Sequence, residues 1–143
     1  MAPPQNQTNV AQCTILATEI STGNVLVNRS FAPSLLAAQG IYGTYLAPPG
    51  STAALPFPAG LTTAYNVYIR NLATTVLGSV VTFNILFSGN STPQVVTLFG
   101  GDVWLYWSLN NSGTILGQGV SAINLLAAAG SNTNASFEYF IGG

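Results

Sequence analysis

Alternation of apolar and polar residues is the feature of this sequence that most restricts its fold. It recurs in four segments of the chain: residues 64–70, 81–87, 103–109 and 135–141. Successive side chains of a β-strand point to opposite faces, so a period of two residues predicts strands with one buried face. Turn sequences rich in Gly, Asn, Ser and Pro separate the segments, which is typical of antiparallel connections.

Further β-rich runs extend the pattern toward both ends of the chain. Residues 12–20 and 25–31 flank the turn sequence Ser21–Asn24 and predict a hairpin. Residues 95–99 and 114–117 predict two more strands, the second of them weak. In residues 103–109, we expect alternation to place Trp107 in the core.

Only two segments suggest helix. Residues 33–39 would form one or two helical turns, because Pro33 suits the first turn and Gly40 follows the last one. Residues 120–127 predict a weak strand, with a short helix over 123–129 as the alternative. About eight short strands at this spacing predict an all-β chain, a single antiparallel β-sandwich or jelly-roll-like barrel with at most one short helix.

The predicted domain organisation is simple. Residues 1–11 would form a flexible N-terminal arm, and residues 12–143 a single β-sandwich domain, a size at which one core suffices. Residues 47–60 contain four prolines and are too proline-rich for a central strand. We expect a long extended loop there, and long loops tend to be functional or to lie against a neighbour.

Charge is almost absent from the chain. Five formal charges are spread over 143 residues, and there is no lysine or histidine. Charged residues make up 3% of the chain, against about a quarter in an ordinary soluble domain. Amide and hydroxyl side chains cost less to bury than ions, and interface cores are depleted in charge. The composition therefore predicts an obligate assembly.

The missing residue types exclude several functions. Without histidine or lysine, neither a His-dependent triad nor a Ser–Lys pair exists, and we predict that the chain is not an enzyme. The single cysteine, Cys13, leaves no ligand set for a metal, so no cofactor or metal is expected; we expect Cys13 to be buried in the first strand. Two arginines are too few for binding nucleic acid. No run of 18 apolar residues occurs, so no membrane span is predicted.

Contact residues are predicted from charge and aromatic content. Arg29 and Arg70, the only cations, would pair with carboxylates across or within subunits. Trp104 and Tyr106 would lie opposite Trp107 on the other side of their strand, in a subunit interface or as a platform for sugar stacking. The proline-rich loop adds Pro48, Pro49 and Phe57 as contact candidates.

The C-terminal half resembles a group of viral structural proteins. The runs that carry the resemblance are Val103-Trp-Leu-Tyr-Trp, Ile123-Asn-Leu-Leu and Ser136-Phe-Glu-Tyr-Phe-Ile-Gly-Gly. They are similar to small virion proteins of tailed bacteriophages, the head decoration and minor capsid β-sandwich proteins. The resemblance covers residues 64–143 and implies a cement protein on the capsid exterior, assembled as a homo-oligomer, most readily a trimer, that binds the major capsid or another shell protein.

Two other functions remain open from the sequence. One is an extracellular filament subunit, pilus-like and assembled by strand donation from a neighbour. The other is a glycan-binding receptor module of a phage fibre, which would rest on Trp104 and Tyr106.

Overall fold

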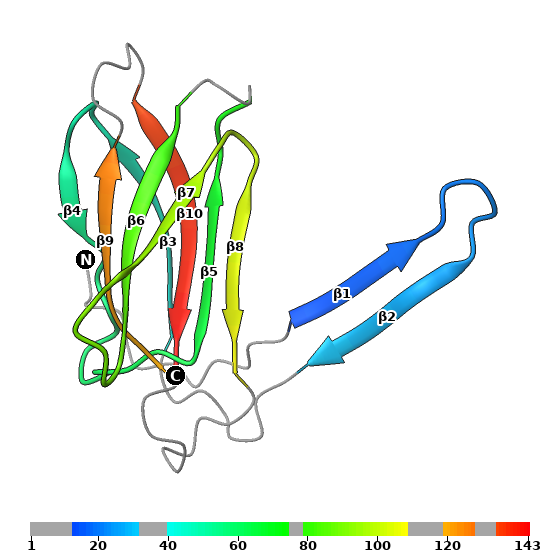
Figure 1. The fold of residues 1–143 in the computed structure, drawn as a ribbon, viewed down its shortest axis with the longest axis horizontal. Coiled ribbons are helices and arrows are strands. Elements are labelled where there is room, and N and C mark those ends of the chain that lie inside the picture. Colours follow the sequence, from blue (N-terminus) through cyan, green and yellow to red (C-terminus); the bar gives the residue numbers. More distant parts are fainter. Residues whose placement is uncertain (1–12, 32–39, 75–78, 109–118, 128–133) are drawn as a thin grey trace, which may run out of the picture.

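A computed structural model of the chain consists of β-strands and connecting turns (Figure 1). It describes residues 13–31, 40–74, 79–108, 119–127 and 134–143. Within those residues there are ten strands and no helix. The predicted all-β fold is confirmed.

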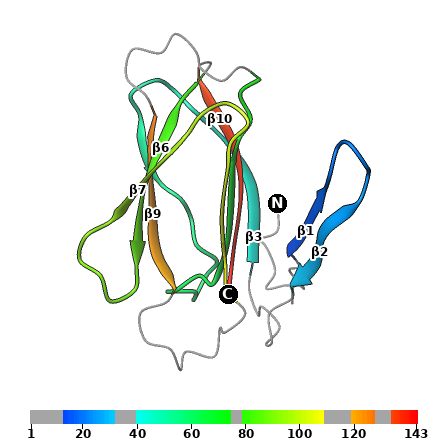
Figure 2. The same cartoon turned by 45° about the vertical axis from the view of Figure 1, so that its right-hand side comes forward.

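Eight of the strands of the described residues form two four-stranded antiparallel sheets that pack face to face (Figure 2). The first sheet contains β3 (Gly40–Ala47), β10 (Ala135–Gly142), β5 (Asn66–Asn71) and β8 (Val103–Trp107), in that order. The second sheet contains β4 (Thr52–Ala54), β9 (Val120–Ala127), β6 (Val81–Phe87) and β7 (Gln94–Leu98), in that order.

The order of these strands is that of a jelly roll. β6 pairs with β7, β5 with β8, β4 with β9 and β3 with β10, so the chain folds back on itself about the β6–β7 turn. The resulting double ribbon then rolls up, and its two ends meet where β10 pairs with β5 and β9 pairs with β6. Eight antiparallel strands rolled in this way give two sheets with a shared core.

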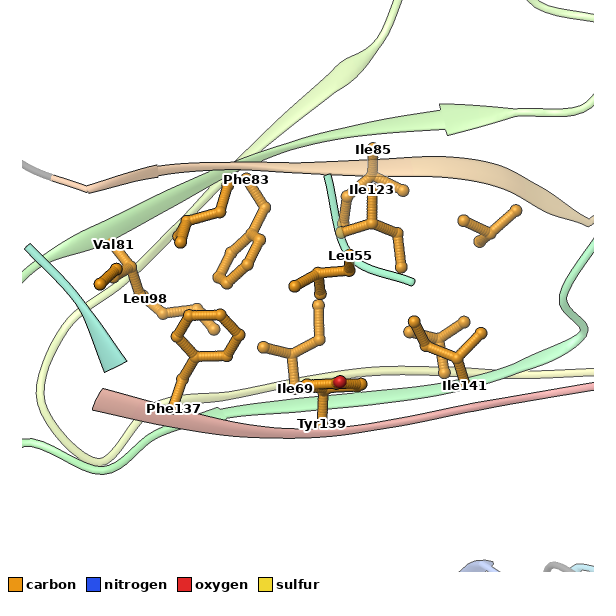
Figure 3. Close-up of a cluster of buried hydrophobic side chains, with 14 of the residues drawn as sticks. Leu55, Ile69, Val81, Phe83, Ile85, Leu98, Ile123, Phe137, Tyr139 and Ile141 are labelled. Atoms are coloured by element: carbon orange, nitrogen blue, oxygen red, sulfur yellow. The ribbon is translucent and has the colours of Figure 1, made fainter. Parts of the chain in front are cut away.

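The core lies between the two sheets, where the apolar side of each strand faces inward (Figure 3). Phe83 and Ile85 of the second sheet meet Ile69 and Phe137 of the first, and all four are fully buried. The rings of Phe83 and Phe137 pack edge to face, with centroids 5.3 Å apart. The alternation in 81–87 and 135–141 thus separates a buried face from an outer one, as the two-residue period predicts. Burying such side chains contributes about 1.5–3 kcal/mol each.

A buried asparagine joins the two sheets at one end. Asn71 Nδ2 donates to the carbonyl oxygens of Ser79, at 2.6 Å, and Leu98, at 3.0 Å. Its Oδ1 accepts from the backbone N–H of Ala73 at 2.9 Å. The amide is thus satisfied on both atoms, which removes the penalty of burying it.

The first hairpin stands apart from the sandwich. β1 (Cys13–Thr18) and β2 (Val25–Phe31) pair only with each other, in a separate two-stranded sheet. Figures 1 and 2 show this hairpin on the side of the first sheet, with its turn as the part most distant from the sandwich. The sequence predicts the hairpin itself but not its detachment, because both of its faces contain apolar residues.

Two local predictions need correction. The helical alternative over 123–129 is wrong for the described residues 123–127, which belong to strand β9. Strand β3 is missed by the sequence reasoning, which ends a helix at Gly40 and assigns nothing to the residues after it. Within the predicted loop 47–60, residues Thr52–Ala54 pair with β9 as a short edge strand, as the prolines around them allow. The predicted arm 1–11, helical turns 33–39 and strand 114–117 lie outside the described residues.

Candidate functional site

The outer surface of the first sheet is the most unusual surface of the described molecule. We call it the aromatic face and define it by the outward side chains of β3, β10, β5 and β8, which are Tyr42, Thr44, Leu46, Ser136, Glu138, Phe140, Asn66, Tyr68, Arg70, Val103, Leu105 and Trp107. Seven of these twelve are aromatic or aliphatic, although they face away from the core. Tyr42, Leu46 and Val103 each keep more than half of their surface exposed.

Strand register arranges these side chains in rows across the sheet. One row contains Tyr42, Phe140, Tyr68 and Leu105, from β3 through β10 and β5 to β8. The neighbouring row contains Thr44, Glu138, Arg70 and Val103. Directly opposed side chains lie about 4.5–5.5 Å apart at Cβ, so each row forms a continuous strip of contacts.

Glu138 is the centre of a polar cluster within this apolar surface. Its Oε1 accepts a hydrogen bond from the Tyr68 hydroxyl at 2.6 Å, and its Oε2 accepts one from the Tyr42 hydroxyl at 3.0 Å. The Arg70 guanidinium approaches Oε1 at 3.9 Å, too far for a hydrogen bond, with half of its side chain exposed. The carboxylate is thus held by two hydroxyl groups and only weakly by its nearest cation.

These contacts shift the acid–base equilibria of the cluster. The hydrogen bonds from Tyr68 and Tyr42 lower the pKa of Glu138, with a smaller contribution from Arg70, and they outweigh the opposing effect of partial burial. Burial and the same hydrogen bond raise the pKa of Tyr68. The hydrogen bond to Glu138 is the main cause that raises the pKa of Tyr42. The site therefore keeps a charged carboxylate and two neutral phenols over a wide pH range.

A groove runs between the aromatic face and the base of the hairpin. It has a volume of about 430 Å³ and is lined by Cys13, Thr14, Tyr68, Val103, Leu105, Trp107 and Phe140. Trp107 and Phe140 stack within it, with ring centroids 6.4 Å apart. Most of its wall is hydrocarbon and aromatic carbon, and its polar groups are few. A groove of this kind suits an apolar polypeptide segment better than a polar small molecule.

Two buried polar atoms lie at one end of the aromatic face. Trp107 and Asn66 are direct neighbours across the β8–β5 ladder. The indole Nε1 of Trp107 and the Oδ1 of Asn66 are both buried without a hydrogen-bond partner, whereas Asn66 Nδ2 donates to the Ser108 carbonyl at 3.4 Å. Unsatisfied buried groups of this kind weaken local stability.

The outer surface of the second sheet has a different character. It carries Thr82, Asn84, Thr97 and Asn124 beside the exposed side chains of Val95 and Leu126. The hydroxyl groups of Thr82 and Thr97 lie 3.2 Å apart, within hydrogen-bond distance. A Thr- and Asn-rich sheet surface is what an antiparallel sheet normally presents to water. The contrast with the aromatic face lies in these hydroxyl and amide groups, which stand where the aromatic face has aromatic rings.

The predicted orientation of β8 is wrong. Trp104 and Tyr106 point inward and pack against the core, whereas Trp107 lies on the outer face. Their rings stack with centroids 6.3 Å apart, and Tyr106 also meets Phe87 at 5.3 Å. Burial raises the pKa of Tyr106. The alternation in β8 is ambiguous because both of its faces are apolar, so the sequence pattern does not distinguish the inner face from the outer one.

The two arginines occupy different environments. Arg70 lies on the aromatic face beside Glu138, in agreement with the expectation of an ion pair within the chain. Arg29 lies on β2, exposed, and its only hydrogen bond among the described residues goes to the Asn28 carbonyl at 3.4 Å. No described carboxylate pairs with Arg29.

The other candidates are scattered over the molecule. Pro48 and Pro49 are exposed between β3 and β4, where the Pro48 carbonyl accepts from the backbone N–H and the hydroxyl of Ser51. Phe57 is half-buried against the core. Cys13 is only partly buried and lies at the start of β1 beside the groove, so the expectation that it would be fully buried is wrong.

Sequence reasoning missed the main components of the aromatic face. Alternation predicts that Glu138 and Phe140 share a face of 135–141, but it assigns no strand to the segment that contains Tyr42 and gives Tyr68 no role beyond an alternating strand. Their meeting depends on β3 and β5 flanking β10, which pairs residues far apart in the chain. Isolated segments contain no signal for that order.

The described residues contain no group of three or more His, Cys, Asp or Glu side chains that would hold a metal ion. The part of the chain that the structure describes contains no helix that could span a membrane. Comparison with family models, with curated proteins and with solved structures finds no match for the chain.

Proposed function

We propose that this chain is a non-enzymatic structural protein of a virion, a decoration or minor capsid protein that assembles as a homo-oligomer, with a trimer favoured, on the capsid exterior. In this role it would cement the shell by adding buried surface across neighbouring shell subunits. Its partners would be copies of itself and the major capsid or another shell protein.

One observation supports this proposal above the others: the aromatic face is a broad apolar surface on a chain that has almost no charge to keep it dispersed. Contiguous exposed apolar patches can mark interaction sites in soluble proteins. A net charge of −1 gives little repulsion between copies. Association would bury the apolar surface and, among the described residues of the aromatic face, remove only two ions, Glu138 and Arg70, from water.

The fold adds support by analogy. Jelly rolls are found in viral capsid proteins, lectins and cupins, so the fold alone does not select a function. A glycan platform built from Trp104 and Tyr106 loses its basis, because both side chains pack against the core. The Glu138 cluster also lacks a second carboxylate, so it offers no acid–base pair for glycoside hydrolysis.

An extracellular filament subunit is the second candidate. Among the described residues, edge strand β8 pairs only with β5, and β1 and β2 pair only with each other, so backbone groups along several edges are open to a neighbour. Head-to-tail contacts that do not close into a ring would produce a filament.

Native mass spectrometry and negative-stain microscopy of the purified chain, followed by co-sedimentation with DNA-filled particles, test the proposal. Closed oligomers that co-sediment with particles are the expected result. Long filaments would support the second candidate instead. If the chain stays a monomer at millimolar concentration and does not bind the particles, both candidate functions are overturned.

A further inference from the structure

The hairpin β1–β2 is expected to be only marginally stable as an isolated arm. Two-stranded hairpins are marginally stable in water unless they pack against something else. Yet large apolar side chains are exposed along this one: Ile15, Leu16, Ile20, Val25, Leu26 and Val27. The hairpin therefore needs a surface to cover it, and within its own chain it extends away from the sandwich (Figures 1 and 2).

The two faces of the hairpin differ. Register places Ile15, Ala17, Val27 and Arg29 on one face, which we call the docking face of the hairpin. The opposite face contains Leu16 and Leu26 together with Asn28 and the hydroxyl groups of Thr14 and Ser30, which lie 2.9 Å apart. One face is thus an apolar strip with a single cation, and the other is mixed and already partly satisfied within the hairpin.

The aromatic face complements this strip in charge and in chemistry. It is apolar, and Glu138 is its only carboxylate among the described residues. Among the described residues, Arg70 is the cation nearest to Glu138, at 3.9 Å, and Arg29 has no carboxylate partner. Because the chain has so few charges, placing Arg29 near Glu138 would fix one register with few competing pairings.

The length of the hairpin also matches the width of the aromatic face. Strands of six and seven residues are about 20 Å long, and four strands spaced about 4.8 Å apart give a sheet about 15 Å across between its outer strands. One hairpin can therefore extend across the full width of the face. Cys13 and Thr14 line the groove at the edge of that face, so the hairpin leaves its own sandwich at the margin of this face.

We infer that the hairpin of one copy lies on the aromatic face of the next copy, docking face inward, with Arg29 beside Glu138 of the neighbour. Such a contact joins two different surfaces, so repetition closes a ring when the rotation per subunit fits. This inference rests on the proposed homo-oligomer and specifies which surfaces join its subunits.

Cysteine trapping tests this arrangement in the full-length chain. In a Cys13→Ser background, one preparation contains Val27→Cys on the docking face, and a second, of different mass, contains Leu105→Cys on the aromatic face. The two are refolded together, oxidised and separated without reductant. We expect mixed disulfides between them at least tenfold above those of a matched pair in which Thr97→Cys, on the polar face of the second sheet, replaces Leu105→Cys.

Three outcomes would overturn the inference. Mixed disulfides no more abundant than in the Thr97→Cys control would show that the faces do not meet. A majority of Val27→Cys homodimers would mean that hairpins pair with each other. A further variant contains both Val27→Cys and Leu105→Cys in one chain. If this variant forms an internal disulfide while the mixture of single variants forms no mixed disulfide, the hairpin folds onto its own sandwich.

A second measurement isolates the charge contact. Arg29→Ala should raise the dissociation constant of the oligomer about tenfold in sedimentation analysis, whereas Asn28→Ala, on the opposite face of the hairpin, should leave it unchanged. Equal effects of the two variants would contradict the assigned face. If the wild-type chain is a monomer throughout, the proposed function fails; if it is an oligomer without the mixed disulfide, only the hairpin inference fails.

Discussion

Glu138 shows how a carboxylate is retained on a largely apolar sheet surface. Two phenol hydroxyls donate to its two oxygens, and the nearest guanidinium is a weaker, more distant partner. Hydrogen bonds that favour the ionised form lower the pKa of a carboxyl group and thereby make stability depend on pH.

The first prediction concerns acid. Because the pKa of Glu138 is lower in the folded chain than in the unfolded one, its contribution to stability is complete above the unfolded value, about 4.3, and is lost as pH falls through the folded value. Urea unfolding at pH 7, 4.5 and 3 should show a steeper loss of unfolding free energy in wild type than in Glu138→Gln. Tyr68→Phe, which removes the strongest donor, should give an intermediate slope; identical slopes for all three chains would rule out this role.

Gly43 is required where Tyr139 crosses the β3–β10 ladder. A Cβ at position 43 would lie 2.7 Å from the Tyr139 hydroxyl oxygen, and Tyr139 is itself buried. We expect Gly43→Ala to reduce the unfolding free energy by about 1–3 kcal/mol, because the ring must move within a packed core. Thermal and urea unfolding measure the loss. Tyr139→Phe in the same chain should recover part of it, and no recovery would indicate that the strain lies elsewhere.

At the scale of elements, the sequence predicts strands well where one face is polar and poorly where both faces are apolar. The faces of β6 and β10 follow directly from alternation, since Thr82 and Asn84 or Glu138 mark the outside. In β8, every residue from Val103 to Trp107 is apolar or aromatic, and the predicted orientation is inverted.

The same reason explains what the sequence could not predict of the site. Tyr42, Tyr68 and Glu138 meet only because the jelly-roll order places β10 between β3 and β5. Pairings between strands distant in sequence depend on how the double ribbon rolls up, which is decided by the packing of both sheets rather than by any one segment. The near absence of charge predicts association, and it does not indicate where on the exterior an apolar surface would lie.

The orientation of β8 gives a matched pair of substitutions. Tyr106 packs inward beside Phe87, and Leu105 lies outward on the aromatic face. Tyr106→Ala should lower the unfolding free energy by about 3 kcal/mol, as expected for truncating an aromatic side chain at a core. Leu105→Ala should change it by no more than about 0.5 kcal/mol, since the side chain is exposed in one copy. Urea unfolding of dilute, dissociated chain measures both; the reverse order would restore the orientation predicted from sequence.

At the scale of the whole molecule, the choice of salt distinguishes the hydrophobic from the electrostatic contribution to assembly. Five charges over 143 residues leave the hydrophobic contribution dominant. Sodium chloride screens exposed charges, with a Debye length that falls from about 10 Å at 0.1 M to about 3 Å at 1 M, whereas sulfate strengthens the burial of apolar surface. We expect the dissociation constant of the oligomer to rise no more than a few-fold between 0.1 M and 1 M sodium chloride, because only an Arg29–Glu138 contact is screened. In sodium sulfate of equal ionic strength, the dissociation constant should fall. Sedimentation velocity across a concentration series measures both effects, and Arg29→Ala should abolish the small chloride dependence while keeping the sulfate dependence. An oligomer that dissociates steeply in chloride would mean that charge, rather than the apolar surface of the aromatic face, joins the copies.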